Sequence, residues 1–240
     1  TTSFASLPDK ASVEEQLSGQ KIDESLGADD AAGLVILIER LATVDPTATR
    51  PAELRAIVAG QLASNVATLI EQGRWDQAQQ LAIDARQLLP AIPAANTLVG
   101  EVERAKTSAE TDIRRQRIEQ LTGAIAQILQ KPTFDPAWEA ELRGNWRRLR
   151  PLLVNDTERF STEQNTIAET FLKEASARQD SQLFVEARDI LRSGQRVLPE
   201  YKGFTAAFES LVASQQEFRK TELAKARAGE ISALKQTLTT

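Results

Sequence analysis

The chain of 240 residues contains no cysteine, no histidine and no methionine. Without cysteine there is no disulfide framework, no thiolate nucleophile and no cysteine-type zinc site. Without histidine the commonest metal ligand is missing, and so is the side chain that most readily acts as a general base near neutral pH. Because cysteine and histidine are both absent, we expect no metal and no cofactor. The lack of methionine, including an initiator, predicts a processed product or an excised domain.

Long apolar runs and aromatic residues are also scarce. The longest apolar run, residues 34–38, is far shorter than the about 20 residues of a membrane-spanning helix, so no membrane span is expected. Aromatic residues make up 5% of the chain, and strand-like alternation of β-branched residues is absent. The nine prolines lie near the ends of helix-like segments. These features predict an all-α fold with a core of Ala, Leu, Ile and Val.

Catalysis by carboxylates alone remains chemically possible, as in glycoside hydrolysis. Adjacent pairs such as Asp29 with Asp30 and Glu14 with Glu15 are explained as favourable charges at helix starts. The 11 glycines are scattered and form no phosphate-binding loop. We therefore expect no enzymatic activity and assign no catalytic residue.

The net charge of −5 is unevenly distributed. Residues 1–100 carry 7 basic and 13 acidic side chains, a net charge of −6. Residues 101–160 carry 11 and 10, and residues 161–240 carry 11 and 11. The acidic first part argues against a nucleic-acid surface there, because such surfaces are basic.

The periodicity of apolar residues predicts helices along most of the chain. Residues 1–28 are expected to be weakly ordered, with one short helix after Ser12, where Ser12 and Glu15 have the spacing of a capping box. Ser161 with Gln164 has the same spacing, and Gly229 is expected to interrupt the final helix. The expected helices span residues 29–44, 51–72, 75–88, 94–130, 136–150, 161–178, 181–197 and 203–228.

Two stretches of the chain can be overlaid without a gap, from Trp75 on Phe184 to Pro90 on Pro199. Each has an aromatic residue, two small residues at helix-contact positions and a proline that ends the helix. The first stretch contains Trp75, Ala78, Ala85 and Pro90, and the second contains Phe184, Ala187, Gly194 and Pro199.

The first stretch, preceded by Gly73 and including Ala82, resembles the second half of a tetratricopeptide repeat, a helical hairpin of 34 residues. In the second stretch Gln182 replaces the turn glycine. The resemblance implies an α-solenoid of helical hairpins that holds a peptide or helix of a partner in a groove. One subtype of the family grips a C-terminal carboxylate with Lys and Asn, but the matching positions here are Ala63 and Ala67, so that activity is not implied.

The resemblance is weakest across the long helix expected at 94–130, so two modules are predicted. These are a first helical-repeat module at 29–107, a connector helix and break at 108–135, and a second module at 136–240. Within the long helix, apolar residues follow the 3-4-3 spacing of a heptad seam. This seam is either packed within the chain or used for self-association. It consists of Ile118, Leu121, Ile125 and Ile128.

Arg143, Arg147 and Arg150 share one face of an expected helix and form the densest basic cluster, together with Arg148. They are either a contact for an anion, nucleic acid or acidic partner, or a solvated face paired with neighbouring acids such as Glu139 and Glu141. The tryptophans are expected in the core. They are Trp75, Trp138 and Trp146.

The sequence thus predicts a non-catalytic scaffold that binds a protein partner. The lack of cysteine favours a periplasmic or extracytoplasmic location over a cytoplasmic one, and we expect a role in bacterial envelope assembly or signalling. Two alternatives stay open. One is binding of nucleic acid or an anionic ligand through Arg143, Arg147 and Arg150, and the other is a structural spacer that forms a homodimer through the 94–130 helix.

Overall fold

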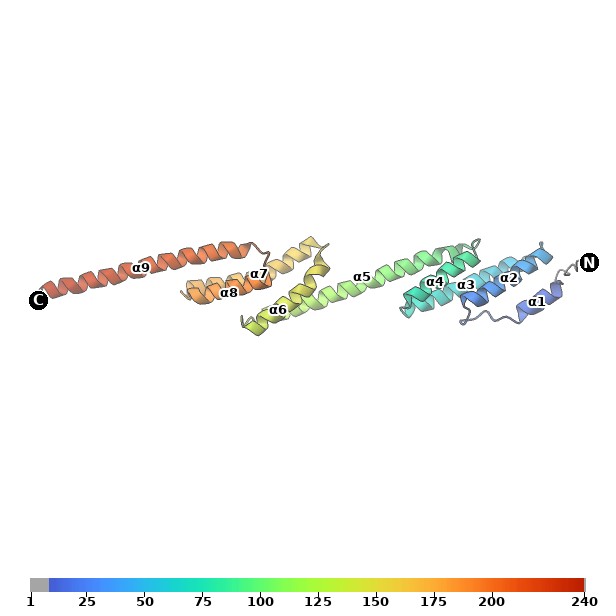
Figure 1. Cartoon of the computed structure of the whole chain (residues 1–240), viewed down its shortest axis with the longest axis horizontal. Coiled ribbons are helices and arrows are strands. Elements are labelled where there is room, and N and C mark those ends of the chain that lie inside the picture. Colours follow the sequence, from blue (N-terminus) through green and yellow to red (C-terminus); the bar gives the residue numbers. More distant parts are fainter. Residues whose placement is uncertain (1–8, 240) are drawn as a thin grey trace, which may run out of the picture. The chain divides into compact units, whose positions relative to one another are not determined.

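The computed structural model describes residues 9–239, with side chains described as far as residue 234 (Figure 1). Within these residues the regular secondary structure is helical and contains no strand, so the predicted all-α fold is confirmed. The chain divides into two compact units, residues 1–112 and 113–240, which we call unit 1 and unit 2. The boundary lies inside one long helix.

In unit 1 each of the first four helices packs against the next one, which is consistent with a solenoid-like arrangement. Its core is formed by one apolar face of each helix, including the first part of the long helix. The helices are α1 (Lys10–Ser18), α2 (Ala28–Val44), α3 (Arg50–Glu71), α4 (Trp75–Leu88) and the beginning of α5 (Pro93–Gln130).

Unit 2 has its own hydrophobic core, to which the end of α5 contributes Leu121 and Ile125. Helices α7 and α8 lie side by side, and α9 packs against both of them (Figure 1). The elements that follow α5 are α6 (Pro136–Leu149), the 3-10 helix η1 (Arg150–Leu153), α7 (Thr157–Asp180), α8 (Phe184–Val197) and α9 (Gly203–Thr239).

The buried positions of the two units correspond almost one to one. From α3 onward the spacing of the overlaid stretches holds: Leu62, Ala78 and Leu89 of unit 1 correspond to Phe171, Ala187 and Leu198 of unit 2, and all six are buried. In the helices before α3, the number of residues that separates a position of unit 1 from its counterpart in unit 2 is smaller by one. There the buried residues Val13, Leu17, Leu34, Ile38 and Leu41 correspond to Leu121, Ile125, Leu142, Trp146 and Leu149.

The repeated element is therefore a unit of five helical segments rather than one hairpin. We call the place of the first segment the first-helix position. It is filled by α1 in unit 1 and by residues 118–130 of α5 in unit 2. The predicted connector at 108–135 is thus not a separate element, because its second half belongs to the core of unit 2.

Two predicted helix starts are wrong because aspartate residues further upstream cap the helices. The Asp9 carboxylate accepts a hydrogen bond from the Ala11 N–H at 2.7 Å, so α1 begins before Ser12. The Asp156 carboxylate accepts from the Arg159 N–H at 3.0 Å, so α7 begins before Ser161. Aspartate is among the strongest N-cap residues.

Two further expectations about order are corrected. Residues 10–18 are helical and bury Val13 and Leu17, and Leu26 is buried in the following loop, so residues 9–28 are not weakly ordered. Residues 1–8 of that prediction lie outside the described part of the chain. Gly229 does not interrupt α9, because one glycine inside a long helix costs only about 1 kcal/mol.

Candidate functional site

The turn between α3 and α4 brings the two helices together at one side of unit 1. Gly73 adopts the left-handed conformation with φ of +68°. The N–H of Arg74 donates to the Leu69 carbonyl and the N–H of Gly73 to the Ile70 carbonyl, both at 2.9 Å. This is the Schellman pattern of a helix end, and it supports the role assigned to Gly73 from the sequence.

An open groove of about 650 Å³ lies along α3 and α4 and is closed at one side by the loop of residues 24–27. We call it the unit 1 groove. Its apolar contacts come from Leu26, Leu69 and Leu81. Its polar lining is mostly uncharged amide and hydroxyl side chains, namely Ser64, Asn65, Thr68, Gln72, Gln77 and Gln80.

The loop that closes the groove is held by hydrogen bonds. Asn65 donates from its amide to the carbonyl of Leu26 at 2.9 Å and accepts from the amide of Gln61 at 2.9 Å. The carboxylate of Asp23 accepts from the hydroxyl and the N–H of Ser25, and these bonds lower the pKa of Asp23. The groove is therefore bounded by a fixed loop rather than a free one.

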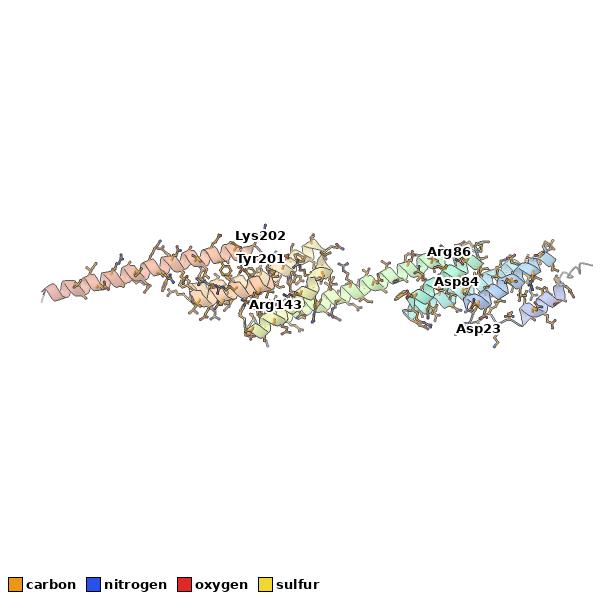
Figure 2. The ribbon with its side chains drawn as sticks, in the orientation of Figure 1. Asp23, Asp84, Arg86, Arg143, Tyr201 and Lys202 are labelled. Atoms are coloured by element: carbon orange, nitrogen blue, oxygen red, sulfur yellow. The ribbon has the colours of Figure 1, made fainter. Side chains whose placement is uncertain are left out.

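The few charged side chains that line the groove include both acids and a base. Glu24, Arg74 and Asp84 contribute to the lining, and Figure 2 marks Asp84 on α4 and Asp23 in the loop region. Asp84 accepts from the amide of Gln80 at 2.9 Å. With two acids and one base, the groove is close to neutral, so electrostatic attraction to a strongly charged ligand is weak.

In unit 2 the corresponding surface is occupied by an ion-pair cluster. Arg178 donates to Glu174 on its own helix at 2.8 Å and to Glu186 on α8 at 2.9 Å, and these contacts raise the pKa of Arg178. Glu174, Arg178 and Glu186 correspond to Asn65, Leu69 and Gln77 of the unit 1 groove. The two units thus differ most clearly in the surface between their third and fourth helices.

The loops of the two units also differ, because Phe134 of unit 2 stands at the position of Leu26 in unit 1. Phe134 adopts a φ of 55° and packs on Trp138 and Phe171, with ring centroids 4.9 Å and 5.7 Å away. An aromatic group thus anchors the loop of unit 2, whereas a hydrogen bond and Leu26 anchor that of unit 1.

Unit 2 also contains a buried carboxylate, Glu139 on α6, which is 7% exposed. It accepts hydrogen bonds from Arg196 on α8 through Nε at 2.8 Å and Nη2 at 2.5 Å, and from the hydroxyl of Ser193 at 2.8 Å. These donors lower the pKa of Glu139 although burial opposes them. Because all its neighbours are partners of the ionised form, Glu139 joins α6 to α8 and is not poised for proton transfer.

The basic face predicted on α6 is largely engaged with acids of unit 2. Arg143 lies 3.7 Å from Glu139, and Arg150 donates to Glu200 at 2.7 Å. Figure 2 shows Arg143 on α6. Arg147 is exposed. The three arginines therefore do not converge on one site, and the geometry favours the solvated, acid-paired interpretation of this face.

The aromatic residues of the overlaid stretches lie in different surroundings. Phe184 is buried in the core of unit 2, and its ring centroid is 5.5 Å from that of Phe218 on α9. Trp75 is only half-buried and is not part of the unit 1 core, so its expected core position is corrected. Trp138 and Trp146 are buried, as predicted.

The heptad seam of α5 is used within the chain. Leu121 and Ile125 are buried in unit 2, Ile118 and Ile128 are partly buried against the same core, and the Ile128 carbonyl accepts from the indole of Trp138 at 2.9 Å. The expectation of self-association through this seam is therefore not favoured. The small repeat positions Ala78, Ala85, Ala187 and Gly194 are all buried.

The residues that line the unit 1 groove were not singled out from the sequence. A signal for them exists, because Asn65, Thr68 and Gln72 follow the 3-4 spacing of one helix face and carry no charge. Such a stripe is easily taken for an ordinary solvent-exposed face. Only the loop at 24–27, folded back by Asn65, makes it one wall of a groove.

Among the residues that the structure describes, no helix is both long and apolar enough to cross a membrane. In the same part of the chain, no three acidic side chains gather as metal ligands would. Comparison with protein-family models, with curated proteins and with solved structures gave no match for this chain.

Proposed function

We propose that this chain is a non-catalytic, tetratricopeptide-like interaction scaffold that binds an extended peptide segment of a protein partner in the unit 1 groove. The observation that carries the proposal is the lining of the groove by uncharged amides and hydroxyls around three leucines. A peptide main chain offers one donor and one acceptor at almost every residue. Glutamine and asparagine side chains supply both kinds of group, so they suit a main chain whatever its side chains are.

The contrast with unit 2 supports the same proposal. Where unit 2 has Arg178 donating to both Glu174 and Glu186, unit 1 has Asn65, Leu69 and Gln77. An internal ion-pair cluster already satisfies its charged groups, whereas the exposed amide of Gln77 is available to a ligand. The apolar part of the groove would take one apolar side chain of the bound segment. The absence of cysteine is the ground for proposing the bacterial envelope as its setting.

The test is selection of peptides from a random display library on the intact chain, followed by measurement of the dissociation constant of the best peptide by fluorescence anisotropy. Gln77→Arg places a long charged side chain in the groove and should weaken binding about tenfold or more, which corresponds to about 1.4 kcal/mol. Gln87→Arg is the matched control, because Gln87 is exposed on the same helix but outside the groove.

Salt dependence separates this proposal from anion binding by the arginine face. Binding in a nearly neutral groove should change little between low and physiological salt. Binding through Arg143, Arg147 and Arg150 should weaken steeply with salt. Selected peptides that bind Gln77→Arg and wild-type protein equally well would refute the groove as the binding site.

A further inference from the structure

The charged side chains of the unit 1 groove lie toward its two ends. On α4 the groove is lined by residues with the 3-3-4 spacing of one helix face, which are Arg74, Gln77, Gln80 and Asp84. Arg74 and Asp84 lie about 15 Å apart along the helix at its usual rise per residue. Arg74 is next to the turn at Gly73, so we call its side of the groove the turn end and that of Asp84 the loop end.

Each end carries a second side chain of the same sign. At the turn end, a shallow hollow shares Arg74 with the groove and is also lined by Asp76 and by Lys106 of α5. At the loop end the loop contributes Glu24, since the loop lies away from the turn between α3 and α4 (Figure 1). Two bases and one acid give the turn end a net charge of +1, and two acids give the loop end −2. The dipole of α4 adds to this polarity, because its positive N-terminus is at the turn end.

These charges have no opposite charge as a partner within the protein. Among the ion pairs of the described residues, none involves Glu24, Arg74, Asp84 or Lys106. Arg74 donates only to the amide oxygen of Gln72 at 3.3 Å, and Asp84 accepts from the amide of Gln80 at 2.9 Å. Both partners are neutral, so the charges remain available to a ligand.

The fold does not require these four charges. All four counterparts in unit 2 are uncharged, although the two units share their helical arrangement. Glu24, Arg74, Asp84 and Lys106 correspond to Pro132, Leu183, Ser193 and Gln215. The charge polarity is thus a property of the unit 1 groove and not of the repeated architecture.

In an inference that rests on the proposed function, we propose that the unit 1 groove selects peptide segments with an acidic and a basic side chain four or five residues apart. An extended chain advances about 3.3–3.6 Å per residue, so this spacing spans the about 15 Å between the two ends. The acid of the segment pairs with Arg74 and Lys106, and its base pairs with Asp84 and Glu24.

The paired charges determine the direction and the register of the bound segment more than its affinity. A segment with one acid and one base is neutral as a whole, and its contacts are short compared with the Debye length. Binding therefore changes little between low and physiological salt, as expected for a nearly neutral groove.

The test compares peptides selected from a random display library on the intact chain and on a variant with exchanged charges. The variant combines Glu24→Lys, Arg74→Glu, Asp84→Lys and Lys106→Glu, so its net charge equals that of the wild type. The wild type should enrich peptides with an acid and a base four or five residues apart, in one order along the peptide. The variant should enrich the reverse order. No preferred spacing, or the same order for both proteins, would overturn the proposal.

Changes in the best wild-type peptide keep the test valid if the variant does not fold. Exchange of its acid and its base should weaken binding to the wild type about tenfold or more, and equal binding of both peptides would overturn the proposal. Asp84→Lys should also weaken binding of the original peptide. Arg86→Glu is the control, because Arg86 is exposed on the same helix but does not line the groove (Figure 2).

The effect of Gln77→Arg separates failure of this inference from failure of the proposed function. Peptides without a charge order that nevertheless bind Gln77→Arg more weakly would overturn the charge selection and leave the groove as the peptide site. Peptides whose binding is unchanged by Gln77→Arg would refute the groove itself.

Discussion

Gly194 on α8 lets the ring of Phe204 on α9 pack closely against it. A methyl group added at this position would lie 2.6 Å from Cζ of Phe204 and 3.1 Å from Cγ of Phe171. In unit 1 the positions of Gly194 and Phe204 are held by Ala85 and Ala95, which are also fully buried. The large ring of unit 2 is thus accommodated by removal of a methyl group from the facing helix.

Replacement of Gly194 by alanine is therefore expected to destabilise the protein by about 1–3 kcal/mol, although alanine is the better helix former. The double variant Gly194→Ala with Phe204→Leu should recover part of the loss, because the smaller side chain leaves room for the methyl group. Denaturant unfolding checks both. A stabilising effect of the single change would contradict the close contact with Phe204.

Glu139 gives a pH dependence whose sign follows from its neighbours. Hydrogen bonds from Arg196 and Ser193 hold the pKa of Glu139 below its value of about 4.3 in the unfolded chain. Ionised Glu139 therefore stabilises the fold above that unfolded value, and the contribution is lost as the pH falls through the lower folded pKa. Glu139→Gln should lower stability at pH 7 and flatten its decline on the acidic side.

Arg196→Gln removes the main partner of the same carboxylate and should cost about 2 kcal/mol at pH 7, since it leaves a buried acceptor with fewer donors. The measurement is the free energy of unfolding at several pH values. Arg192→Gln is the control, because Arg192 is exposed and contacts only Asp189 at 3.6 Å among the ion pairs described. Equal effects of the two changes would show that Glu139 is not held by Arg196.

At the scale of the helices, the turn between paired helices is made twice with different residues. Gly73 and Gln182 both adopt a positive φ, of 68° and 62°, and both end their helix with the same pair of backbone hydrogen bonds. A residue with a Cβ is strained in this conformation by about 1–2 kcal/mol, whereas glycine is not. The turn of unit 2 therefore keeps its shape through its surroundings.

We expect Gln182→Gly to stabilise the protein by about 1 kcal/mol and Gly73→Ala to destabilise it by a similar amount. No heavy atom lies within 4 Å of a methyl group placed on Gly73, so its change reports backbone conformation alone. Thermal unfolding of both variants tests the pair. Loss of stability in Gln182→Gly would mean that the glutamine side chain contributes more than its strain removes.

The helices themselves could largely be predicted from the sequence. The predicted helix 75–88 matches α4, and the predicted helix 94–130 differs from α5 by one residue, because proline and glycine mark these ends. The starts of α1 and α7 could not be predicted, because serine and aspartate compete as caps within a few residues. The groove was missed because its loop is folded back by Asn65, a contact over 39 residues.

At the scale of the whole molecule, the duplication extends over five helical segments. The sequence alone reveals only the fourth of these segments, α4 in unit 1 and α8 in unit 2. Between the positions of Leu41 and Val58, unit 2 has a single residue more than unit 1, so one ungapped overlay loses the first half. Corresponding core residues also differ in size, as with Ile38 and Trp146. Packing can conserve the position of a side chain while its volume changes, provided that its neighbours compensate.

Each unit has its own core, so a core change should act locally. Leu62 is fully buried in unit 1, and Leu62→Ala should cost about 2–5 kcal/mol. Hydrogen exchange should then become faster in α2, α3 and α4 and stay unchanged in α7 and α8. The reciprocal variant Phe171→Ala should accelerate exchange in unit 2 alone. Faster exchange throughout the chain in either variant would mean that the two units unfold together.

The central claim is that the unit 1 groove binds an extended peptide, and hydrogen exchange of the intact chain with its best selected peptide tests it most directly. We predict slower exchange in residues 24–27, 64–72 and 74–84, and no such protection in Gln77→Arg at the same peptide concentration. Protection confined to unit 2, or centred on the arginine face of α6, would contradict the claim.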